Sequence, residues 1–147
     1  FKHPNANDFI RVAEKTSGIQ LQWLKEYWVN STKTIDYGLN NIEVNANNAN
    51  AIISIQRNGK FPMPIEVLVT YKDGTSELHY IPLDLMLGAK PAEGSVKRMM
   101  HTEWQWVAPN YSFETSKPLS VLKSIEIDPS QRMPDINRSN NKLEIPN

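Results

Sequence analysis

Residues 65–81 read IEVLVTYKDGTSELHYI and predict a β-hairpin. Val67 and Val69 recur at every second position of the first run, which is the period of a β-strand. Lys72-Asp73-Gly74 follows, and aspartate and glycine are frequent in tight turns because they tolerate the backbone angles that a turn requires. A second run, 75–81, completes the pattern, so we expect two antiparallel strands joined by this turn.

Similar runs on both sides of the hairpin indicate more strands. They contain Ile42 and Val44, Ile53 and Ile55, and residues 121–127. Trp104 and Trp106, two positions apart, are expected to share one face of a further strand. Several short strands at this spacing are typical of two packed sheets. We therefore predict a mainly β fold, an immunoglobulin-like antiparallel β-sandwich over residues 33–128.

Two short α-helices are expected before the sandwich, in residues 1–32. Asn7 is suited to cap the first helix, because its side-chain oxygen can accept a hydrogen bond from a free backbone amide. Gly18 is suited to end this helix in the left-handed conformation. Phe9 and Val12 are spaced to lie on one side of it.

The second helix resumes at Ile19 and places Leu21, Leu24 and Trp28 on one stripe. So wide an apolar surface on so short a helix has to be buried, against the sandwich or against another domain. These three residues are therefore our candidates for interdomain packing. We expect Trp28→Ala to loosen the helices from the sandwich.

The remaining segments are polar or rich in turn residues. Residues 87–98 contain Gly88, Pro91 and Gly94 and predict a long loop. Residues 129–147 are rich in asparagine and predict a loosely ordered polar C-terminal tail. The predicted organisation is thus a helical segment, the sandwich and a tail.

Composition restricts the partners of the chain. Its 147 residues suffice for one domain with a core. Sixteen basic and sixteen acidic residues give a formal net charge of +0, so no overall field attracts nucleic acid, and we expect no such partner. No apolar run approaches the roughly 20 residues that span a bilayer, so we expect no membrane insertion. Cysteine is absent, which excludes disulfides and thiolate chemistry.

Side chains that could carry chemistry are scattered. The histidines, His3, His79 and His101, include no pair four residues apart, the spacing at which a helix presents two imidazoles to one zinc ion. Carboxylates such as Glu77 are spread over turns and strands, and we expect them to be solvated. We therefore predict no catalytic, cofactor-binding or metal-binding residue within the chain.

The first helices resemble those of one enzyme family. Residues 3–15, followed by Ser17-Gly18, Leu21 and Tyr27-Trp28, are similar to the end of the catalytic domain in aminopeptidase N-type gluzincins. There a capped helix, a Ser-Gly stop and a second helix with a tryptophan lead into a β-sandwich. Pro62-Met63-Pro64-Ile65 and Ile127-Asp128-Pro129-Ser130 look like the sandwich of bacterial exported members. Familiar members have a Gly and a Pro after the second helix, which this chain lacks.

This resemblance implies a parent zinc metalloaminopeptidase, a hydrolase that removes N-terminal residues from peptides. Its His-Glu-x-x-His zinc helix and other catalytic motifs would lie upstream of Phe1, so no functional residue is carried over. The chain would be a non-catalytic C-terminal support and interaction domain. Its partners would be the catalytic domain of its own polypeptide and the peptide substrate, and its location periplasmic or extracellular.

Trp104, Trp106 and Tyr111 suggest a rival function. A flat row of aromatic rings can stack on sugars or peptide side chains, which would make the chain a stand-alone glycan- or peptide-binding module. Large aromatic residues also dominate cores and interfaces, and we favour the core or an interdomain seam. A third possibility is a structural adaptor that self-associates through exposed sheet edges.

Overall fold

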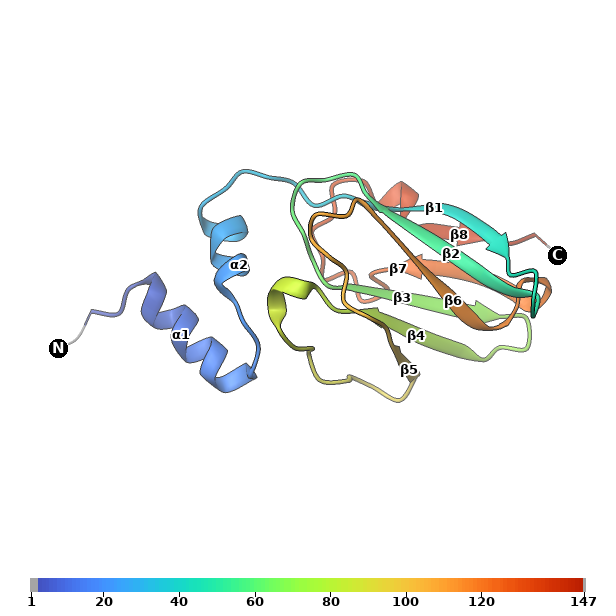
Figure 1. Ribbon diagram of the computed structural model, residues 1–147, viewed down its shortest axis with the longest axis horizontal. Helices are drawn as coiled ribbons and strands as arrows, with labels where there is room; N and C mark the ends of the chain where they lie inside the picture. The colour runs from blue at the N-terminus through green and yellow to red at the C-terminus, as the bar shows by residue number, and fades with distance from the viewer. Residues whose placement is uncertain (1–2, 147) are drawn as a thin grey trace.

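The computed structural model describes residues 3–146 and places their eight strands in two sheets that share one core (Figure 1). The strands are β1 (Tyr37–Val44), β2 (Asn50–Arg57), β3 (Ile65–Tyr71), β4 (Ser76–Ile81), β5 (Lys97–Met100), β6 (Asn110–Pro118), β7 (Leu122–Ile127) and β8 (Lys142–Glu144). The sheet orders are β1-β2-β6 and β5-β4-β3-β7-β8. This arrangement confirms the mainly β, two-sheet prediction.

Pairing within the sheets differs from the prediction at one strand. All neighbouring strands are antiparallel except β4 and β5, which run parallel. The parallel pair arises because β4 is followed by η2 (Asp84–Met86) and the loop 87–96, a connection long enough to carry the chain back to the start of β4. The immunoglobulin-like character of the sandwich stays a prediction.

β3 and β4 form the predicted hairpin. Ile65 lies opposite Ile81, and Thr70 lies opposite Ser76. Gly74 in the turn has a φ of 81°, a left-handed angle that glycine adopts without steric cost. The core follows the same period of two, because Val67 and Val69 are fully buried, as are Ile53 and Ile55 of β2 in the facing sheet. Burial of such a side chain stabilises the fold by about 1.5–3 kcal/mol.

α1 (Ala6–Ser17) begins at a different cap from the one predicted. The side-chain oxygen of Asn5, rather than that of Asn7, accepts the backbone N–H groups of Asn7 and Asp8, at 2.9 and 3.1 Å. Asp8 in turn accepts the N–H of Asn5 at 3.1 Å, which completes a capping box. Gly18 ends the helix with a φ of 72°, as expected.

The second helix is shorter and wider than predicted. α2 (Gln22–Leu24) continues as a π-helical turn, η1 (Lys25–Val29), in which the N–H of Asn30 donates to the carbonyl of Lys25. Leu21 precedes the first turn, and the wider turn displaces side chains from α-helical spacing. Leu21, Leu24 and Trp28 therefore do not form one buried stripe. Trp23 is the buried tryptophan, with 8% of its surface exposed, whereas Trp28 is 46% exposed.

Residues 129–146 are part of the sandwich, so the prediction of a loose tail is wrong for the described residues. β8 pairs with β7, and Met133 is buried in the core. The carboxylate of Asp135 is buried and accepts the N–H of Tyr37 at 3.0 Å and the N–H of Asn137 at 2.8 Å. This segment is polar because its side chains satisfy backbone groups at the start of β1, and polarity here does not indicate disorder.

We expect Trp23→Ala to lower the free energy of unfolding by about 3 kcal/mol, because it empties a buried site in the core. Trp28→Ala should cost only about 1 kcal/mol, since it removes an exposed ring whose edge contacts Phe61. Urea unfolding followed by far-UV circular dichroism measures both values. Equal losses for the two variants, or a larger loss for Trp28→Ala, would contradict the assignment of Trp23 to the core.

Candidate functional site

An apolar hollow lies between α1 and η1. It encloses about 390 Å³ and is lined by Ala6, Phe9, Ile10, Leu24, Lys25, Trp28 and Val29. Phe9, Trp28 and Val29 are between 46% and 70% exposed, and Val12 of α1 is 60% exposed. We call Phe9, Val12, Trp28 and Val29 the helical face. Leu24 and Trp28, two of the predicted packing residues, thus line this hollow, and Leu21 does not.

The segment that carries the helical face is attached to the sandwich by residues that follow α1. The N–H of Gln20 donates to the carbonyl of Met86 at 2.7 Å, and the rings of Tyr27 and Trp28 contact Phe61. Ile10 is the one residue of α1 that is buried. Figure 1 shows α1 lying beyond α2, away from both sheets. Most of α1 is therefore open to another surface.

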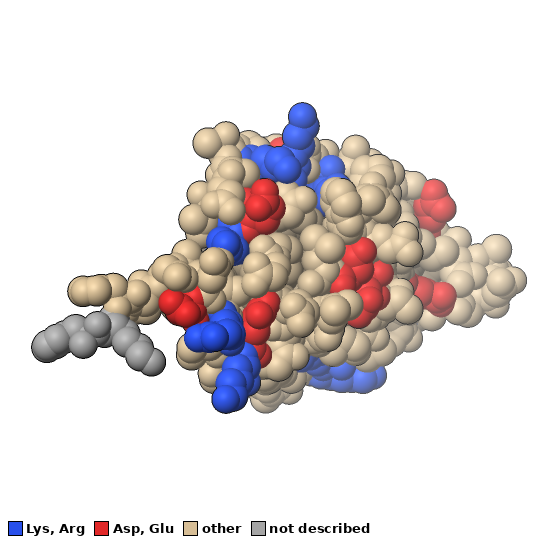
Figure 2. Space-filling model, turned by 60° about the vertical axis from the view of Figure 1, so that its left-hand side comes forward, with Lys and Arg blue, Asp and Glu red and all other residues tan. Residues whose placement is uncertain are grey.

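Charge is evenly mixed over the face of the molecule seen in Figure 2. Lys and Arg side chains alternate with Asp and Glu side chains in small groups, separated by broad uncharged areas. Such a surface offers no extended field of one sign. Among residues 3–146, no helix combines the length and the apolar character needed to cross a bilayer.

The aromatic platform of the rival interpretation is not assembled. Residues 101–109 form no regular strand. Trp104 makes an isolated bridge with Leu83, and Trp106 lies in a turn. Trp104 is buried, and its Nε1 donates to the carbonyl of Ala108 at 2.9 Å. The Tyr111 hydroxyl donates to the carbonyl of Thr102 at 2.8 Å. Trp104 thus belongs to the core, and the expectation that it shares a strand face with Trp106 is wrong.

A buried polar cluster surrounds Glu77, which we expected to be solvated. Its carboxylate is 3% exposed and accepts hydrogen bonds from four groups: the Tyr71 hydroxyl, Nε2 of His79 at 2.9 Å, the N–H of Ser116 at 3.1 Å and the Ser116 hydroxyl. Ser116 lies on β6, so its two bonds to Glu77 join the two sheets. Hydrogen bonds from these protein groups replace the hydrogen bonds with water that the Glu77 carboxylate loses on folding.

His79 and His101 extend the Glu77 cluster toward the surface. Nδ1 of His79 lies 2.7 Å from Nε2 of His101, and both rings pack against Phe113. An ionised carboxylate only accepts hydrogen bonds, so Nε2 of His79 carries a proton and its Nδ1 accepts from Nε2–H of His101. The bonds therefore run in one direction, from His101 through His79 to Glu77.

The pKa values in the cluster follow from burial and these bonds. Burial alone would raise the pKa of Glu77, but hydrogen bonds from Ser116, Tyr71 and His79 outweigh it and lower the pKa to about 2. Burial lowers the pKa of His79. Burial, and then the neighbouring His79, lower the pKa of His101 to about 4. At neutral pH the cluster therefore holds one carboxylate and two neutral imidazoles.

We expect the free energy of unfolding to fall as the pH is lowered from 6.5 to 4. The unfolded histidines bind protons near pH 6.5, whereas folded His101 does so only near pH 4, so protons favour the unfolded chain across this window. Glu77 extends the loss from its ordinary pKa of 4.5 down to about 2. Urea unfolding at several pH values measures the slope. His101→Gln should flatten it between pH 6.5 and 4, while the exposed control His3→Gln should not; an unchanged slope in His101→Gln would contradict this account.

Comparison with known proteins adds no relative to this description. No protein-family model matches the chain, and no curated protein or solved structure matches it. The resemblance of the first helices to aminopeptidase N-type gluzincins therefore stays a proposal, and the geometry described above has to support any functional assignment.

Proposed function

We propose that the chain is a non-catalytic support and interaction domain that docks through the helical face onto a catalytic domain of its own polypeptide. The observation that carries this proposal is the exposed apolar surface around the hollow between α1 and η1. Exposed apolar residues scattered singly are ordinary, but a hollow rimmed by several large ones is typical of an interaction site.

The energetics of α1 favour the same assignment. An isolated helix of this length is marginal in water, because the cost of nucleating it is repaid by few hydrogen bonds. α1 has 12 residues and a single buried side chain, Ile10, so its packing within the chain is slight. A partner that covers Phe9 and Val29 would bury apolar area worth about 25 cal/mol per Å² and stabilise the helix in place.

The resemblance supplies the nature of the partner. The residues that resemble aminopeptidase N-type gluzincins include both helices that carry the helical face. We therefore propose a zinc metalloaminopeptidase as the parent protein, with peptides as its substrates and a periplasmic or extracellular location. Within residues 3–146 no three histidine, aspartate or glutamate side chains converge as metal ligands. The proposal assigns zinc to the catalytic domain.

The rival binding module is less well supported. It needs Trp104, Trp106 and Tyr111 as one exposed platform, but Trp104 is buried and the Tyr111 hydroxyl is bonded to the backbone. Only Trp106 of the three has a largely open ring, at 43% exposure. A single exposed tryptophan does not make a stacking row.

The coding sequence that adjoins Phe1 at the native locus provides the first test. We expect an in-frame His-Glu-x-x-His motif followed by a distant glutamate, and we expect the full polypeptide to release N-terminal residues from peptides in a zinc-dependent manner. An unrelated adjoining domain, or a start codon directly before Phe1, would remove the peptidase assignment.

Hydrogen exchange then tests the docking surface in the full polypeptide. Amides of α1 and η1 should exchange at least about tenfold more slowly there than in the 147-residue chain, because the partner domain suppresses local opening. The double variant Phe9→Asp, Val29→Asp should lose this protection. Val44→Asp is the matched control, since Val44 is similarly exposed on β1. Equal exchange in the chain and in the full polypeptide would contradict docking through the helical face.

A further inference from the structure

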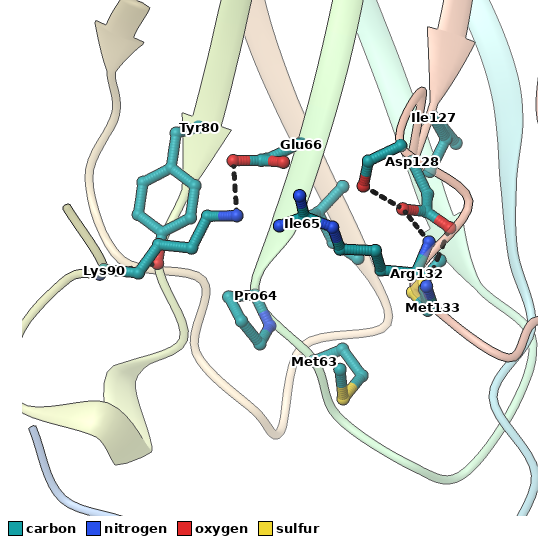
Figure 3. Close-up of a pocket in the computed structure, with 11 residues that line it drawn as sticks. Met63, Pro64, Ile65, Glu66, Tyr80, Lys90, Ile127, Asp128, Arg132 and Met133 are labelled. Carbon is teal, nitrogen blue, oxygen red and sulfur yellow. Dashed lines mark hydrogen bonds and ion pairs between the residues drawn. The ribbon is translucent and has the colours of Figure 1, made fainter. Parts of the chain in front are cut away.

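A second hollow lies where the loops 87–96 and 128–135 meet the start of β3. It encloses about 200 Å³, and its apolar walls come from Met63, Pro64, Ile65, Ile127 and Met133. Three of these, Ile65, Ile127 and Met133, are buried core residues, so the walls are firmly held. Figure 3 shows Lys90 and Arg132 approaching this hollow from opposite sides. We call it the Ile65 pocket.

Both cations of the pocket already hold carboxylates of the chain. Nζ of Lys90 lies 2.9 Å from Oε1 of Glu66, which also lines the pocket, and 4.0 Å from Oε1 of Glu93. Nη1 of Arg132 lies 2.6 Å from Oε2 of the same Glu93. Arg132, and then Lys90, lower the pKa of Glu93. One carboxylate thus lies between the two cations, at a position that adjoins the Ile65 pocket, because Lys90 and Arg132 line this pocket and Glu93 lines a neighbouring hollow.

Glu93 is a weakly held occupant of that position. The side chains of Glu93 and Arg132 are 56% and 66% exposed, and ion pairs so open to water contribute little to stability. Glu93 also lies in the loop 87–96, which forms no regular secondary structure. An ammonium group offers three donors and a guanidinium group five, so Lys90 can keep Glu66 while it binds another anion. Replacement of Glu93 by an external carboxylate therefore costs little free energy.

We propose that the Ile65 pocket binds an aliphatic carboxylate. The carboxylate replaces Glu93 between Lys90 and Arg132, and the aliphatic part contacts the side chains of Ile65 and Met133. Two sources carry this chemistry, namely the C-terminal residue of a peptide with an apolar side chain and a free fatty acid. A dissociation constant on the order of 1 mM is expected for a ligand of this size. This site is independent of the docking surface proposed above.

Nuclear magnetic resonance of the ¹⁵N-labelled full chain tests the proposal with three probes: N-acetyl-leucine, octanoate and the uncharged N-acetyl-leucinamide. Both acids should shift the backbone amide signals of Ile65 and Met133, and the leucinamide should bind at least about tenfold more weakly. Arg132→Gln should weaken binding of the acids about fivefold or more. Glu93→Gln should strengthen it severalfold, because it removes the internal competitor.

Controls separate binding from folding and identify the source. Lys72→Gln, in the exposed β3–β4 turn, removes the same kind of charge elsewhere and should leave the affinity unchanged. Thermal unfolding of each variant establishes that it is folded. Tighter binding of N-acetyl-leucine than of octanoate assigns the peptide C terminus, and the reverse order assigns a fatty acid. Equal binding of acids and leucinamide, unchanged affinity in Arg132→Gln, or no shift with either acid would overturn the proposal.

Discussion

The buried carboxylate of Glu77 imposes the strictest requirement on this fold. A charge removed from water carries a large free-energy cost unless hydrogen bonds replace its hydration. The replacements come from Tyr71 on β3, His79 on β4 and Ser116 on β6, and therefore from both sheets. The sheets can satisfy Glu77 only when Ser116 lies next to it. The same alignment brings β2 and β3 together, so that their isoleucine and valine side chains share one core.

Elements whose determining contacts are local could be predicted from the sequence. The hairpin 65–81 depends on its own alternation and its Asp-Gly turn, and α1 ends at the left-handed Gly18. The start of α1 could also have been predicted from the sequence. Asn5 and Asn7 both have a capping side chain, but only Asn5 is followed three residues later by an acid, Asp8, that can complete a capping box.

The polar cluster could not be predicted because both faces of the five-stranded sheet carry apolar residues. Leu68 and Leu78 point to the face that is partly covered by the loop 87–96, opposite to the face of Glu77 and His79. Alternation in β4 is therefore equally compatible with Leu78 in the core and Glu77 in water. The side chains that place Glu77 rather than Leu78 on the inner face are distant in sequence. Ser116 and His101 lie 39 and 24 residues away from Glu77. The buried hydrogen bond of Asp135 could not be predicted for the same reason, because its partner Tyr37 is 98 residues away.

Glu77 and His79, two deeply buried groups of the polar cluster, are already occupied by hydrogen bonds within the fold. Glu77 already accepts four hydrogen bonds, and the two from Ser116 join the sheets. Nδ1 of His79 is likewise occupied by His101. The exposed apolar side chains of the helical face and the Lys90–Arg132 pair at the Ile65 pocket are, by contrast, accessible from solvent. Surfaces of this kind can recognise a partner without chemical change, and the two proposals rest on them.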